Sequence, residues 1–134
     1  MSNPKYVYKL VPSSSPVPDT PNLPERLPLS ELDTASGFIH LSTAVQIPGT
    51  LKHFFAEHDK MYVLRIEYAK VEGDIKWETP DATVCGERGG EGLFPHLRNG
   101  GQLGRGEIES VVVWHRTSGS WDEALENAEA WLVY

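Results

Sequence analysis

Proline and glycine are concentrated in two segments of this chain, and these segments limit where helices and strands can form. Six of the ten prolines lie in residues 12–28, and eight of the twelve glycines lie in residues 86–106. Proline lacks the N–H that a helix or strand interior needs, and glycine is entropically costly there. We therefore expect a proline-rich loop insertion at 12–28 and a glycine-rich loop at 86–106. Loops of this length are uncommon in a compact domain and are often functional.

Five short runs rich in aromatic and β-branched residues are typical of strands. The run at 108–115 is apolar on both faces, which predicts a central strand. In the run at 75–78, the alternation places Trp77 toward the core and Glu78 toward solvent. The five expected strands are residues 6–11, 38–41, 61–68, 75–78 and 108–115.

Two capping-box patterns predict helix starts, because the side chains of such a pair satisfy unpaired N–H groups of the first turn. Thr43 with Gln46 opens the first helix, which Pro48 restarts in its first turn. Ser120 with Glu123 opens the second, a C-terminal helix expected over 120–132. The apolar face of the first helix is expected to hold Ile47, Leu51, Phe54 and Phe55.

Short strands outnumber helices in this pattern, so we predict an α+β fold. The chain has 134 residues, which is close to the common length of one domain, and we expect a single domain over 1–134. The net charge of −7 argues against a broad basic surface for nucleic acid but leaves room for a small anionic ligand. No apolar run approaches the roughly 20 residues of a membrane span.

The single cysteine, Cys85, excludes an intrachain disulfide framework and an all-cysteine zinc site. With no apolar leader at the N-terminus, these features predict a cytoplasmic protein that does not enter a membrane. No pattern in the sequence indicates an oligomeric state. Cys85 as a nucleophile is the minor alternative, since no activating base lies near it in sequence.

His40 lies in a short apolar run that is followed at once by hydroxyl residues. Ser42 shares its face of an extended strand, and Thr43 begins the next helix. An imidazole, a hydroxyl and the N–H groups of a helix N-terminus would then converge, which suits an anion. A buried histidine bonded to backbone, with Thr43 acting only as a cap, is the equal alternative.

His96 is the second candidate, within the segment expected to be a glycine-rich loop. Pro95 restricts the backbone beside it, and Phe94 and Leu97 can anchor it to the core. The segment 86–106 has a local charge of +1, which is compatible with phosphate or carboxylate recognition. A surface loop with solvated charges is the competing interpretation. The charges concerned are Arg88, Arg98 and Arg105 against Glu87 and Glu91.

The remaining histidines, His53, His58 and His115, are interpreted as structural or solvated. His53 and His58 are five residues apart and so lie on different helix faces, whereas a zinc pair needs a spacing of four. We therefore expect no metal site. The sequence also lacks both glycine-rich nucleotide fingerprints.

Three motifs together resemble those of the domain-of-unknown-function 952 family. The first is Gly37-Phe-Ile-His-Leu-Ser-Thr-Ala44, continuing through residues 46–51 to Phe54-Phe55; the others are Trp77-Glu78 and Gly92-Leu-Phe-Pro-His-Leu97. The resemblance covers roughly residues 6–114, leaving the proline-rich insertion and the C-terminal helix outside.

This resemblance implies a fold similar to that of the ADP-ribosyltransferases, in which a mixed, largely antiparallel split β-sheet with two or three helices clasps NAD. His40 and Ser42 match the element that grips the dinucleotide in that superfamily. A later glutamate usually supports the reaction, and Glu109 or Glu107 is the topological guess. Arg98 departs from the tyrosine that the family usually has after His-Leu.

The leading hypothesis is thus an ADP-ribosyltransferase-like enzyme or relative that binds NAD or a related phosphorylated, nucleotide-like molecule. The alternatives are a non-catalytic module for a small metabolite or a protein, and a histidine-based isomerase or hydrolase. The expected catalytic residues are His40, His96 and Glu78, and the expected ligand-binding residues are Ser42, Thr43, Glu91, Phe94 and Arg98.

Overall fold

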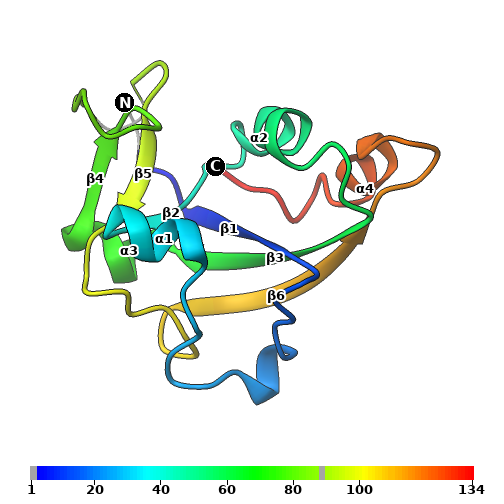
Figure 1. Ribbon diagram of the computed structural model, residues 1–134, viewed down its shortest axis with the longest axis horizontal. Coiled ribbons are helices and arrows are strands. Elements are labelled where there is room, and N and C mark those ends of the chain that lie inside the picture. Colours follow the sequence, from blue (N-terminus) through cyan, green and yellow to red (C-terminus); the bar gives the residue numbers. More distant parts are fainter. Residues whose placement is uncertain (1–2, 88–89) are drawn as a thin grey trace.

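The computed structural model describes residues 3–87 and 90–134 and shows two three-stranded sheets with short helices around them (Figure 1). Every strand pair within the two sheets is antiparallel. The α+β prediction is therefore confirmed. A split sheet was also expected. The expected sheet was mixed, however, and no parallel pair occurs among the described strands. Arg88 and Gly89, part of the expected glycine-rich loop, lie outside the described residues.

The first sheet has the strand order β1 (Tyr6–Pro12), β3 (Lys60–Glu67) and β6 (Ile108–His115). The prediction that 108–115 is the central strand is wrong, because β3 is central and β6 pairs only with β3. The apolar character of β6 has another cause. Trp114 packs beneath the C-terminal helix, and the Val111 N–H on the outer edge donates to the Thr20 hydroxyl at 3.0 Å.

The second sheet has the order β2 (Ile39–His40), β5 (Phe94–Leu97) and β4 (Ile75–Glu78). Strand β5 lies inside the segment expected to be a glycine-rich loop, so that expectation is wrong for these four residues. Their apolar side chains outweigh the surrounding glycines, since Leu97 and Pro95 are fully buried. An isolated bridge between Tyr8 and Ser42 joins the two sheets.

Four α-helices occur in the described residues, where two or three were expected. Helix α1 (Glu31–Ser36) was not predicted: the Ser30 hydroxyl caps it by accepting from the Asp33 N–H at 3.0 Å, and Gly37, with φ 80°, ends it. Helix α3 (Tyr68–Val71) follows β3 directly.

The two predicted helices both form, with later starts than expected. Helix α2 (Ile47–Phe54) begins after Gln46, whose side chain accepts from the Thr43 N–H at 2.9 Å. Helix α4 (Asp122–Asn127) is shorter than the predicted 120–132. Glu123 does not complete a capping box there, because it accepts a hydrogen bond from the Thr117 hydroxyl.

Two apolar clusters lie on opposite faces of the first sheet. One face packs against α2 and α4 through residues such as Leu51, Met61 and Trp121, and both helices lie on that side in Figure 1. The other face packs against the second sheet through residues such as Leu64 and Leu97. Phe54 belongs to neither cluster and is 68% exposed, so its predicted place on the buried helix face is wrong.

The proline-rich segment 12–28 folds against the protein and includes a short 3-10 helix, η1 (Thr20–Asn22). Val17 and Leu23 are buried in the core. The Leu27 N–H donates to the Leu103 carbonyl at 2.8 Å, and the Arg105 N–H donates to the Pro24 carbonyl at 2.9 Å. This pairing holds the segment beside residues 103–105, where it forms part of a cavity wall.

Candidate histidine site

His40 and His96 lie directly opposite each other in the antiparallel register of β2 and β5. Their ring centroids are 5.3 Å apart, with 60° between the ring planes. Phe38 packs against both rings, with centroid distances of 4.5 Å to His40 and 4.2 Å to His96. The two histidines that the sequence placed 56 positions apart are thus brought together by one strand pairing.

Asp33 fixes the orientation of His40. Its Oδ1 lies 2.7 Å from His40 Nδ1 and also accepts the His40 backbone N–H at 3.2 Å. Its Oδ2 accepts from the Lys9 ammonium at 2.6 Å. Burial alone would raise the pKa of this carboxyl, but the His40 hydrogen bonds and the Lys9 charge together lower it. Asp33 is therefore an ionised carboxylate with only 2% of its surface exposed.

Glu78 fixes the orientation of His96, with Oε1 lying 3.0 Å from His96 Nδ1. Its carboxylate also accepts from Arg98 Nε at 3.1 Å and from Arg98 Nη2 at 2.9 Å. The prediction that Glu78 faces solvent is wrong, since it is 4% exposed. The reason is cross-strand pairing: the imidazole of His96 in β5 and the guanidinium of Arg98, directly after β5, bond to the carboxylate and shield it.

These contacts determine the protonation states of Glu78 and His96. Burial would raise the pKa of Glu78, but the hydrogen bonds from Arg98 and His96 outweigh it and lower the pKa. Burial lowers the pKa of His96 despite the opposing bond from Glu78, which favours the neutral imidazole. Because a carboxylate only accepts, the neutral ring holds its proton on Nδ1 and leaves Nε2 as an acceptor.

A cavity of about 650 Å³ lies beside the histidines and is lined by His40, Ser42, Phe94 and His96. These are four of the eight predicted site residues. Lys9 and Asp33 line it as well, and they neutralise each other. The rest of the wall is largely apolar and comes from β1, the proline-rich segment, α1, α2 and the Leu103 region.

The other predicted site residues do not line this cavity. Glu78 lies behind His96, and the guanidinium of Arg98 stacks 4.5 Å from the centre of the Phe38 ring while bonded to Glu78. Thr43 is buried, with its N–H bonded to Gln46, and Glu91 is exposed in the loop before β5.

The two glutamates suggested by topology also lie elsewhere, so that guess is not supported. Glu109 forms a two-bond ion pair with Arg65 at 3.0 Å, and Glu107 accepts from the Gly104 N–H at 2.9 Å. Neither lines the cavity beside His40.

Sequence reasoning missed Asp33, Lys9 and Phe38. Asp33 had a detectable signal, because Ser30 three residues before it and Gly37 after it are cap residues of a short helix. Lys9 gave no signal, since a lone lysine in a strand is usually solvated. Among the described residues, no group of three or more His, Cys, Asp or Glu side chains is arranged to hold a metal ion.

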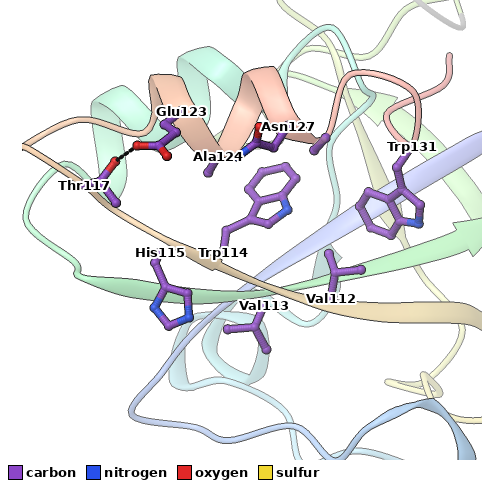
Figure 2. Close-up of a pocket in the computed structure, with 10 residues that line it drawn as sticks. Val112, Val113, Trp114, His115, Thr117, Glu123, Ala124, Asn127 and Trp131 are labelled. Carbon is purple, nitrogen blue, oxygen red and sulfur yellow. Dashed lines mark hydrogen bonds between the residues drawn. The ribbon is translucent and has the colours of Figure 1, made fainter.

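A second cavity, of about 480 Å³, lies between β6 and α4. Figure 2 shows Trp114 beneath α4 and Trp131 beside it, below the segment that follows the helix, with Glu123 bonded to Thr117 at the rim. Glu123 is the only carboxylate among the described residues that line it, and no carboxylate orients His115 there. The histidine pair and its buried carboxylates therefore make the first cavity the candidate site.

The fold and this site define a two-sheet α+β protein with a pair of carboxylate-bound histidines at one cavity. The chain belongs to the family described as protein of unknown function (DUF952), whose sequence profile matches residues 22–111. The match contains all three motifs, which confirms the resemblance. Part of the proline-rich segment, residues 22–28, lies inside the matched range, contrary to expectation.

The crystal structure of protein CC0527 from Caulobacter crescentus is similar to this chain, with a TM-score of 0.62 and 23% identity over 90% of this chain and 98% of that one. A double mutant of the same protein gives the same values. At this identity the likeness shows the fold alone. No curated protein matches the chain. Within residues 3–87 and 90–134, no helix has the length and apolar character to cross a membrane.

Proposed function

We propose that the chain is an ADP-ribosyltransferase-like enzyme or relative that binds a small ligand at the His40–His96 pair. NAD or a related molecule with a phosphate or similar anionic group is the first candidate. The observation that carries this proposal is that each imidazole has its Nδ1 fixed by its own buried carboxylate. Among the described residues no hydrogen bond to either Nε2 occurs, and both histidines line the cavity.

This arrangement gives the two rings definite chemical roles. Each carboxylate holds the Nδ1–H tautomer and the ring orientation, as the partners of catalytic and metal-bound histidines do. His96, favoured as the neutral form, offers Nε2 as a base or acceptor. His40 Nε2 would accept from a ribose hydroxyl, or would donate to a phosphate oxygen when it carries a proton, and Ser42 adds a hydroxyl to the same wall.

The carboxylates themselves are already bonded. Glu78 is held by Arg98 and His96, and Asp33 is held by Lys9 and His40. Both therefore act as positioning residues, and chemistry in the cavity falls to the imidazoles. This observation favours, as a second candidate, either a histidine-based isomerase or hydrolase or a non-catalytic binding module.

The test compares ligand binding by the wild type with that by His40→Asn and His96→Asn. Asparagine places an amide N–H near the position of Nδ1, so the buried carboxylate keeps a donor while Nε2 is removed. His53→Asn is the matched control, because His53 is exposed on α2 and does not line the cavity. Melting temperature and isothermal titration calorimetry with NAD, ADP-ribose, AMP and phosphate report binding.

Binding of one of these ligands by the wild type and the His53 variant, lost in both site variants, supports the proposal. Release of nicotinamide from NAD, followed by chromatography, separates an enzyme from a binding module. Equal binding by all four proteins, or no binding of any phosphorylated ligand, would overturn the assignment of this ligand class to the histidine pair.

A further inference from the structure

Large apolar side chains are exposed around the mouth of the histidine cavity. Leu29 is 41% exposed, Leu32 is 61% exposed and Phe54 is 68% exposed, and all three line this cavity. They come from the segment before α1, from α1 and from the end of α2, so no single helix face explains their exposure. Apolar side chains that gather at one cavity mark a site for an apolar partner.

The inner wall of the cavity is also apolar. Leu10, Val17, Leu27, Leu41 and Leu103 line it, and each is buried or partly buried in the folded chain. A nucleobase or ribose placed against such a wall would bury several polar atoms without partners, which is unfavourable. An alkyl chain or another apolar body would meet the wall without that cost.

The polar end of the cavity offers no free lysine or arginine among the described residues that line it. Lys9 is the only lysine or arginine among the described residues that line the cavity, and its ammonium lies 2.6 Å from Asp33. Arg98 is bonded to Glu78 and stacked on Phe38. Among the described residues that line the cavity, the Nε2 atoms of His40 and His96 and the hydroxyls of Ser42 and Ser15 make no hydrogen bond within the chain. The first three belong to the histidine pair and its neighbour Ser42, and they suit one compact headgroup.

We infer that the ligand of this cavity is an amphiphile: one anionic headgroup at His40 and His96, joined to an apolar chain that extends along the leucine wall toward Leu32 and Phe54. The headgroup binds together with a proton, which makes an imidazole Nε2 a hydrogen-bond donor to it. This inference rests on the proposed binding role of the histidine pair, but it names an amphiphile in place of NAD as the ligand. A carboxylate and a monophosphate share the headgroup chemistry, and the experiment distinguishes them.

The test is calorimetric titration of the whole chain with butyrate, hexanoate, octanoate and decanoate, each below its micelle concentration. Decyl phosphate, decyltrimethylammonium and NAD are the comparison ligands. Each fully buried CH₂ group strengthens binding by about fourfold, so affinity should rise by about sixteenfold for every two carbons until the cavity is filled. Decyl phosphate against decanoate shows which anion the site prefers, and the cationic amphiphile should bind far more weakly than either.

Variants locate the two ends of the ligand. Leu32→Asn and Phe54→Asn should weaken decanoate binding by about fivefold or more without unfolding the chain, since both side chains are largely exposed. Val45→Asn is the matched control, because Val45 is 76% exposed and lies outside the cavity lining. His40→Asn should reduce the preference for decanoate over decyltrimethylammonium.

The outcomes separate this inference from the proposed function. If NAD binds in a histidine-dependent way and the affinity for the fatty acids does not depend on their chain length, the amphiphile inference is wrong but the histidine site stands. If the affinity rises with chain length but is the same for anionic and cationic amphiphiles and is unchanged by His40→Asn, the placement of the headgroup at the histidines is wrong. If no probe responds to either histidine variant, both proposals fail.

Discussion

Replacing Asp33 by Asn is the most informative single test of how the site is held together. Asp33 is 2% exposed, and the Lys9 side chain bonded to it is 13% exposed. The substitution leaves a buried ammonium facing an amide that can itself donate. Removing one partner of a buried ion pair typically costs about 3–5 kcal/mol. Lys9 keeps a 3.3 Å bond to the His40 carbonyl, so we expect the lower end, about 3 kcal/mol.

For a domain of this size, that loss corresponds to a fall in melting temperature of about 12 °C. Urea unfolding followed by tryptophan fluorescence measures it directly. The matched control is Asp59→Asn, because Asp59 forms an ion pair of similar length, 2.9 Å, with Arg116 but is 88% exposed. An exposed pair contributes about 1 kcal/mol or less.

A double-mutant cycle with Lys9→Met completes the experiment. If Lys9 and Asp33 stabilise each other as a buried pair, Lys9→Met with Asp33→Asn should be more stable than the sum of the single losses predicts, by about 1–3 kcal/mol. Equal costs for Asp33→Asn and Asp59→Asn, or strict additivity in the cycle, would refute this account of the pair.

Two further predictions concern stability. Burial lowers the pKa of His96 in the folded chain, so the unfolded chain takes up this proton first and the unfolding free energy should fall as pH drops below about 6.5. In urea unfolding measured between pH 7.5 and 5, His96→Asn should reduce this dependence of the unfolding free energy on pH. The same pH dependence in the wild type and the variant would contradict the assignment of this effect to His96. At Gly104 a Cβ atom would collide with the Glu25 carbonyl, whereas at Gly106 it would meet nothing within 4 Å. Gly104→Ala should therefore lose about 1–3 kcal/mol in urea unfolding while Gly106→Ala stays near the wild type, and equal stability of the two variants would disprove the close approach.

Local patterns in the sequence were sufficient for most strands and for half of the predicted site residues. The expected strand 75–78 forms at those residues, and 108–115 forms as β6. His40, Ser42, Phe94 and His96 do line one cavity. These predictions succeeded because alternation and the motif residues act over a few neighbouring positions.

The failures involve contacts between distant parts of the chain. Glu78 is buried because Arg98, twenty positions later, covers it. Helix α1 has six residues, too few for an apolar period to show, and its Asp33 is held by Lys9, twenty-four positions earlier. Composition also does not distinguish the edge strand of the first sheet from its central strand. The edge strand β6 is as apolar as a central strand because η1 covers its outer edge.

The pairing of β2 with β5 has a consequence for how such a site can be gained or lost. Only two residue pairs define this register, Ile39 with Leu97 and His40 with His96. Side chains alternate between faces, so insertion or deletion of one residue in either strand would rotate one imidazole to the opposite face. Point substitutions can change the chemistry of this cavity gradually, but a change of length in these two strands would remove it in a single step.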